Sequence, residues 1–137
     1  MKYALLLAFL SLPVFAAPVK LNFTQTMGKT GKVYFAVFNS SSQFPKGKPV
    51  TSGSVSVAGE REASFLVDLP AGDYAVSIFL DENNNGKLDQ NFIGIPTERF
   101  GFSNNPRILT GAPSYNDCLI RVLDQENDFT IRLIKLF

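Results

Sequence analysis

The feature that most limits the fold of this chain is a two-residue alternation of apolar and polar side chains. Along residues 19–26 the apolar positions are Val19, Leu21 and Phe23. Side chains with this period lie on one face of a β-strand. No segment keeps a helical period for more than two turns. The sequence therefore predicts an all-β fold.

The same alternation gives further strands along the chain. They lie at residues 32–38, 54–57, 63–69, 74–80 and 129–136. Residues 32–38 are apolar on both faces, which predicts a central strand covered on both sides, with Phe35 in the core. Short strands separated by turns are typical of a sandwich. We therefore expect an antiparallel β-sandwich of about seven strands.

The first 16 residues have the organisation of a cleavable signal peptide. Lys2 precedes an apolar run at residues 4–10, and Pro13 breaks that run. Cleavage after Ala16 would place small residues where signal peptidase reads them, so we expect Ala17 to be the mature N-terminus. The alternative is a membrane anchor, which would need about 20 apolar residues. Because Pro13 interrupts the run well before that length, we favour the signal peptide.

Residues 17–137 are predicted to form one exported domain, periplasmic or secreted, with no transmembrane segment in the mature form. Without Lys2 the basic count falls from 13 to 12, equal to the 12 acidic residues. This balance gives no basic stripe, so we do not expect nucleic acid as a partner. Cys118 is the only cysteine. It cannot form an internal disulfide and is predicted to be a small buried apolar residue.

A connection of nearly fifty residues separates the strand that ends at Leu80 from the one that begins near Phe129. Connections this long usually carry function in a compact domain. Within it, residues 114–117 have the spacing of a capping box, which predicts one short helix packed on the sandwich. Earlier, residues 39–49 form a loop that is polar except for Phe44, which we expect to act as an apolar plug.

The sharpest local motif is Asp-Glu-Asn-Asn-Asn-Gly-Lys-Leu-Asp at residues 81–89. Side-chain oxygens at alternate positions and a glycine at the sharp turn form the first half of a calcium loop. The predicted ligands are the side chains of Asp81, Asn83 and Asn85, the Lys87 carbonyl, and Asp89 directly or through water. Phe92 stands where a calcium loop has its bidentate Glu. We therefore expect a weak site unless another loop contributes a carboxylate.

A plain turn is the alternative interpretation of the same residues. Asn and Gly tolerate positive φ, and their side chains satisfy a tight reversal. In either case the motif follows a strand rather than a helix. This context excludes the EF-hand fold.

Several stretches together resemble a known bacterial family. They are residues 35–39, 74–76, 81–83, 86–89, 94–96 and 101–105. They resemble the signature of the bacterial domain of unknown function 2141 family, and the likeness covers almost all of the mature chain. The resemblance implies a small exported protein, an immunoglobulin-like or transthyretin-like sandwich, with no settled activity.

A second candidate site lies in the long connection. Its predicted ligand-binding residues are Arg99, Phe100, Phe102, Asn104, Asn105 and Tyr115. Aromatic rings and amides of this kind would line a groove for a glycan, a peptide or an envelope protein. The alternative is that Phe92, Phe100 and Phe102 fold back and cap one end of the sandwich.

The absence of histidine limits the chemistry open to this chain. It excludes Ser-His, Cys-His and His-ligated metal schemes. A carboxylate pair, as in glycoside hydrolysis, is left, with Asp81 or Asp89 near Glu98 or Asp117. Turns, caps and metal ligation explain these acids equally well. We therefore expect a non-catalytic binding or accessory module of the cell envelope; the alternatives are a structural subunit that uses a free strand edge and a carboxylate-dependent hydrolase.

Overall fold

The computed structural model describes residues 8, 10–12 and 15–136. Most of the expected signal peptide, residues 1–16, lies outside the described residues, and those of its residues that are described are exposed. In the described part of the chain, no helix is long and apolar enough to cross a membrane.

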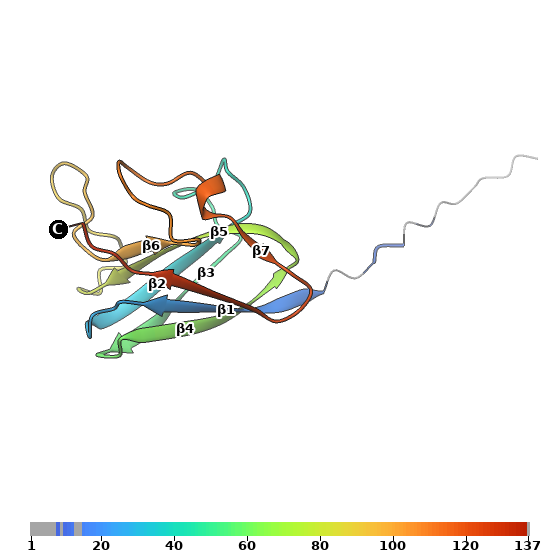
Figure 1. Ribbon diagram of the computed structural model, residues 1–137, viewed down its shortest axis with the longest axis horizontal. Helices are drawn as coiled ribbons and strands as arrows, with labels where there is room; N and C mark the ends of the chain where they lie inside the picture. Colours follow the sequence, from blue (N-terminus) through green and yellow to red (C-terminus); the bar gives the residue numbers. More distant parts are fainter. Residues whose placement is uncertain (1–7, 9, 13–14, 137) are drawn as a thin grey trace, which may run out of the picture.

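The described residues form two β-sheets that pack face to face (Figure 1). The elements are β1 (Ala16–Thr24), β2 (Thr30–Phe38), β3 (Thr51–Ala58), β4 (Glu62–Pro70), β5 (Gly72–Asp81), β6 (Phe100–Phe102), the 3-10 turn η1 (Asn116–Cys118), β7 (Ile120–Val122) and β8 (Asn127–Arg132). The three-stranded sheet has the order β4-β1-β8. The five-stranded sheet has the order β3-β2-β5-β6, and β7 also pairs with β5. The predicted all-β sandwich is confirmed.

One strand pair departs from the expected antiparallel arrangement. β8 runs parallel to β1, from Val19 opposite Asn127 to Thr24 opposite Arg132. The reason lies in the connection before it. β7 runs antiparallel to β5 and ends beside Gly72, at the end of the sandwich where β1 begins. The chain turns there, enters the other sheet and runs alongside β1 in the same direction.

The six predicted strands correspond to β1 to β5 and β8, with ends that differ by a few residues. β6 and β7 were not predicted, because three residues are too short to show an alternation. The expected short helix is a single 3-10 turn, η1. The Asp117 backbone N–H donates to Ser114 Oγ at 3.2 Å, which is the capping bond that the sequence suggested.

The core lies between the two sheets, and Phe35 of β2 is at its centre. Its side chain is 3% exposed, and its ring lies 4.6 Å from that of Phe65 and 6.1 Å from that of Phe23, centroid to centroid. Gly53 of β3 stands opposite. A Cβ atom at Gly53 would come within 2.9 Å of the Phe35 ring, so glycine allows the ring to lie against β3.

The two long sides of the sandwich differ. On one side, Phe100 and Ile134 exchange backbone hydrogen bonds of 3.0 and 2.7 Å, which join β6 to the segment after β8. On the other side, within the part of the chain that the structure describes, β3 pairs only with β2, and β4 pairs only with β1. Val55 of β3 and Phe65 of β4 remain partly exposed there. The sandwich is therefore closed along β6 and open along β3.

Candidate functional site

The predicted calcium loop begins at the last residue of β5. Asp81 is fully buried, and in the sheet it stands opposite Lys32 at the start of β2. The C-terminal segment and the turn between β3 and β4 lie at this same end of the sandwich (Figure 1). The regular pairing of β5 with β2 therefore fixes the first candidate ligand.

The loop wraps around the Asp81 carboxylate. Oδ2 accepts the Gly86 backbone N–H at 2.8 Å, and Oδ1 accepts that of Asn85 at 3.3 Å. Asn84 and Gly86 have φ values of +56° and +77°, which Asn and Gly adopt more readily than other residues. This explains why the sequence places these residue types at the tip of the reversal.

Asp89 closes the loop from the other side. Its carboxylate accepts the side-chain amides of Asn83 and of Asn85, the latter at 2.6 Å. The Asn85 Oδ1 atom accepts the Lys87 backbone N–H at 3.1 Å. The structure thus joins Asp81, Asn83, Asn85 and Asp89 in one hydrogen-bonded loop, and it holds Lys87 there through its backbone N–H. Two neutral amides donate to the Asp89 carboxylate.

Glu98 also belongs to this loop, although the sequence suggested it only as a partner in acid-base chemistry. It is 7% exposed. Its two carboxylate oxygens accept the backbone N–H groups of Glu82 and Asp89, at 3.2 and 3.1 Å. Burial raises the pKa of the Glu98 carboxyl, and the charges of Asp89 and Asp81 raise this pKa further, against the lowering effect of the two hydrogen bonds.

The return of Glu98 depends on backbone pairing that spacing alone does not reveal. Gln90 and Pro96 form an isolated β-bridge, and the Thr97 N–H donates to the Asp89 carbonyl at 2.9 Å. Residues 91–95 are thereby set apart as a separate turn. The sequence does carry a signal for Glu98, the Pro-Thr-Glu directly after this turn. A search that expects the acidic calcium ligand at a fixed position finds Phe92 and misses Glu98.

The loop offers a metal ion both carboxylate oxygens and neutral amide or carbonyl oxygens as ligands. Among the described residues, no three His, Cys, Asp or Glu side chains are arranged to hold a metal ion. Calcium also accepts amide and backbone carbonyl oxygens as ligands. A calcium ion here would therefore depend on the two Asn side chains and the Lys87 carbonyl as well as on carboxylates.

The second predicted site divides into two groups, of which the first is aromatic. We call Phe38, Phe44, Phe102 and Tyr115 the aromatic cluster. The Phe44 ring lies 5.5 Å from that of Phe38 and 5.9 Å from those of Phe102 and Tyr115, all edge to face. Phe100 is buried, 6.1 Å from Phe102. Phe44 is half-buried against rings from β2, β6 and the long connection, outside the main core cluster, and the rings pack chiefly on one another.

The second group holds the long connection in place. Asn105 donates its amide to the Thr130 carbonyl at 3.0 Å and accepts the Arg132 N–H at 2.8 Å. The Asn104 amide donates to the Asp117 carbonyl at 3.0 Å. These amides therefore tie the loop to β8 and η1. Arg99 is half-buried, and its carbonyl accepts the Leu80 N–H at 2.8 Å.

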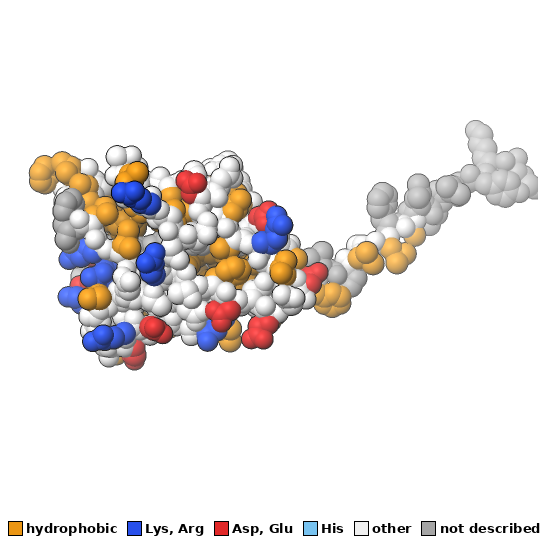
Figure 2. Space-filling model, in the orientation of Figure 1, with side chains coloured by type: hydrophobic (Ala, Val, Ile, Leu, Met, Phe, Trp, Pro, Cys, Tyr) orange, Lys and Arg blue, Asp and Glu red, His pale blue; other side chains and the backbone are white. Residues whose placement is uncertain are grey.

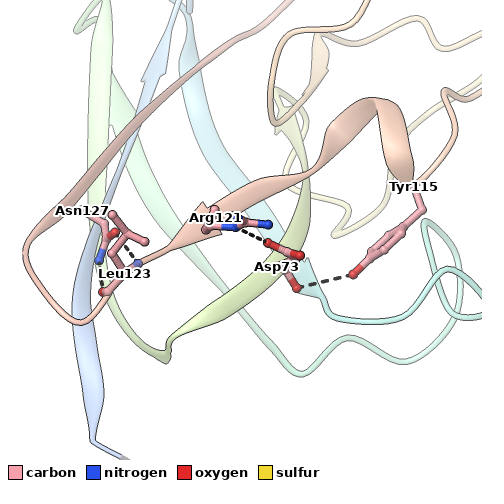
Figure 3. A network of polar contacts seen from close by, with 5 residues as sticks. All are labelled: Asp73, Tyr115, Arg121, Leu123 and Asn127. Atoms are coloured by element: carbon pink, nitrogen blue, oxygen red, sulfur yellow. Dashed lines mark hydrogen bonds and ion pairs between the residues drawn. The ribbon is translucent and has the colours of Figure 1, made fainter.

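Tyr115 lies at the edge of a polar network near the start of β5 (Figure 3). Its hydroxyl donates to the Asp73 carbonyl at 3.5 Å, and Arg121 Nε donates to Asp73 Oδ1 at 3.1 Å. Burial raises the pKa of Tyr115, and the Asp73 charge adds to the effect. The hydroxyl therefore stays a hydrogen-bond donor at neutral pH. Asn127 separately accepts the Leu123 N–H at 2.9 Å.

Cys118 and the cavities contribute little to a site. Burial raises the pKa of the Cys118 thiol to about 12, so the thiol is protonated and shielded, as expected of a buried apolar residue.

The larger cavity, about 600 Å³, is lined partly by Phe15 and Ala16 of the expected signal peptide. A smaller one of about 40 Å³ lies beside Phe102. Neither is lined by the 81–98 loop.

Taken together, the fold and its loops define a small two-sheet β-sandwich with one loop rich in side-chain oxygens. The family model for DUF2141, described as an uncharacterized protein conserved in bacteria, matches residues 22–130, and the chain belongs to this family. The predicted resemblance is thereby confirmed, and the match includes both candidate sites. No curated protein and no solved structure matches the chain significantly.

Proposed function

We propose that this protein is an exported, non-catalytic accessory module of the bacterial envelope, and that its 81–98 loop binds calcium. The position of Glu98 carries the calcium proposal. The motif lacks a carboxylate at Phe92, and the buried Glu98 carboxylate lies on the same loop, held by the Asp89 and Glu82 N–H groups. It supplies the acid that the linear motif lacks.

The arrangement around Asp89 gives further support. Its carboxylate is compensated by two amide N–H groups, from Asn83 and Asn85. A hard cation would take the place of these donors and turn the amide oxygens toward itself, because calcium prefers six to eight oxygens. With Asn at two ligand positions, we expect a dissociation constant on the order of 10⁻⁴ to 10⁻³ M.

The proposal of export is supported by the signal-peptide pattern and by the start of the fold. Ala17 is buried in β1 and pairs with Leu69, so cleavage after Ala16 would keep this strand pairing. The intact mass of the secreted product tests this. A product that begins at Ala17 is expected, and one that retains residues 1–16 would contradict it.

The non-catalytic proposal rests on how the carboxylates are used. Both oxygens of Asp81 and both oxygens of Glu98 accept backbone N–H groups. Asp117 lies on η1, where its carbonyl accepts the Asn104 amide, and it is not part of the loop. A general acid or base must reach a substrate proton. Asp81 is fully buried and Glu98 is 7% exposed, so a substrate has little access to either carboxylate, whereas a small ion held inside the loop would use the second lone pair of these oxygens.

Thermal unfolding tests the calcium proposal. Calcium at about ten times its dissociation constant should stabilise the mature protein by about 1.4 kcal/mol and raise Tm by a few degrees. Asp81→Ala should abolish this increment, although it also lowers the baseline Tm because two backbone hydrogen bonds are lost. Asp89→Asn keeps the shape of the side chain and should reduce the increment with less damage to the loop.

Three controls make the result specific. Magnesium replaces calcium to measure general ionic effects, and chelator gives the metal-free baseline. Asp68→Asn removes one exposed carboxylate from β4 and should leave the calcium increment unchanged. If wild type melts at the same temperature in chelator, magnesium and calcium, the loop is a turn and the proposal is wrong.

The open side of the sandwich supports a second candidate function, as a structural subunit. β3 has no charged residue and no proline over Thr51–Ala58, and no other described strand pairs with one of its edges. Natural proteins usually protect such edges with charge or proline. We propose that β3 pairs with β3 of a second copy, which would place serine opposite serine and bring no like charges together.

Sedimentation velocity tests this second candidate. The mature protein should form a concentration-dependent dimer, and Ser54→Lys should prevent it, because a lysine on an edge strand disfavours pairing. Ser64→Lys, on an exposed position of β4, is the matched control. A wild-type protein that stays monomeric at all concentrations would contradict the assembly.

A further inference from the structure

The turn at residues 91–95 exposes two large apolar side chains. Phe92 is 99% exposed and Ile93 is 63% exposed. We call this pair the apolar tip. Single exposed apolar residues are common on protein surfaces, but a phenylalanine with almost no protein contact is unusual. Ile93, its neighbour in the sequence, adds further apolar surface at the same point.

The apolar tip is held on a well-defined turn. The Asn91 side-chain oxygen accepts the N–H groups of Ile93 and Ile95, both at 3.0 Å. The Asn91 N–H donates to the Ile95 carbonyl at 2.9 Å, and Gly94 closes the turn with φ +83°. The backbone therefore satisfies its own hydrogen bonds. The exposure of Phe92 follows from the turn and does not depend on an unformed loop.

The apolar tip projects from the end of the sandwich that carries the 81–98 loop. Figure 1 shows residues 90–97 as a loop standing out beyond the strands, at the end opposite the N-terminal segment. Figure 2 shows hydrophobic atoms at the outermost point of this end and Lys and Arg side chains gathered below them. The tip is convex, and basic side chains lie below it in this view.

Charge at this end is biased toward basic groups in solvent. The exposed basic residues are Lys29, Lys32, Arg61, Lys87, Arg132 and Lys135. The exposed acidic residues are Glu60, Glu62 and Glu82, of which Glu82 lies 4.0 Å from Lys29. The other carboxylates at this end are buried or engaged: Asp81, Glu98 and Asp89. Among the exposed charged residues at this end, the six basic groups therefore outnumber the three acidic ones.

We propose that the apolar tip docks on an anionic phospholipid surface, with Phe92 and Ile93 inserted at the interface and the basic residues behind them facing the headgroups. Stable interfacial binding usually combines an apolar insertion with a polybasic patch. A standard protein interface buries about 800 Å² per partner around a well-packed centre. Two side chains on a convex turn offer too little surface for such an interface. Binding to a bilayer requires only a short apolar insertion and basic groups near the anionic headgroups.

Vesicle sedimentation tests the proposal with the mature protein. The vesicles contain one quarter phosphatidylglycerol in phosphatidylethanolamine, or phosphatidylcholine alone, and every mixture contains chelator. Chelation makes the result independent of the calcium proposal. We expect binding to the anionic vesicles and little to phosphatidylcholine. Binding should weaken strongly between about 50 and 500 mM salt, because exposed charges are screened.

Two variants distinguish insertion of the apolar tip from unspecific binding through any exposed apolar residue. Phe92→Ser should weaken binding to the anionic vesicles by about tenfold. Leu66→Ser removes a side chain that is 71% exposed on β4, away from the turn, and should leave binding unchanged. The proposal is overturned if wild type does not bind, if both variants lose binding equally, or if Phe92 is required only for capture by a protein in a membrane-free extract.

Discussion

The phenylalanines outside the main core are packed at one end of this sandwich and exposed at the other. At one end, Phe44 and Phe102 pack edge to face, with Phe38 and Tyr115 around them. At the other end, Phe92 is almost fully exposed. The difference is in what covers each ring. Phe102 belongs to a paired strand and meets a ring from a second loop, whereas Phe92 stands on a turn that bonds only within itself. An aromatic residue in a loop is buried only if another segment reaches it.

A substitution in the core between the sheets should lower the stability of the protein more than a substitution at either end. Phe35 contacts Phe23 and Phe65 across the two sheets. Phe35→Ala should lower the free energy of unfolding by about 3 to 5 kcal/mol, because it leaves a cavity between packed layers. Chemical denaturation of the mature protein measures this loss. A value below about 1 kcal/mol would show that β2 is not the central strand of the core.

The aromatic cluster should give the next largest effect. Phe44 is half-buried and touches three other rings. Phe44→Ala should lower the free energy of unfolding by about 2 to 3 kcal/mol, less than a central core position because its site is partly open to solvent. Phe44→Leu, which keeps most of the apolar volume, should recover part of the loss. Equal stability of Phe44→Ala and wild type would mean that the cluster contributes no packing energy.

The fold could be predicted from the sequence where it depends on local pattern. The alternation in β1, β2 and β5 persists over nine or ten residues. The expectation that β2 is covered on both sides is met only in part. Val33, Phe35 and Val37 are buried against the other sheet, whereas Tyr34 and Ala36 on the outer face are half-buried. The parallel pairing of β8 with β1 could not be predicted. It depends on where β7 ends in three dimensions, and no periodicity within β8 contains that information.

The candidate sites show the same limit. The loop from Asp81 to Asp89 is continuous in sequence, and the structure brings its predicted ligands together. Glu98 joins this loop through the pairing of Gln90 with Pro96, which a linear count misses. Asn105 has the residue type of a ligand-binding position, but its amide is used by the backbone of β8. The residue type determines which hydrogen bonds a side chain can make, and the fold determines which partners lie within reach.

The exposed end should give the smallest effect on stability. Phe92 is 99% exposed, and the turn that carries it is held by Asn91 through backbone and amide groups. Phe92→Ala removes a ring that has little apolar surface buried in the folded state. The free energy of unfolding should therefore change by no more than about 0.5 kcal/mol, as for other exposed positions. Denaturant titration beside Phe44→Ala compares the two ends directly. A loss above about 1.5 kcal/mol would mean that Phe92 packs against the protein in solution, and the contrast between the ends would then fail. Asn91→Ala is the matched probe of the turn. It should cost more than Phe92→Ala, because two backbone N–H groups lose their acceptor.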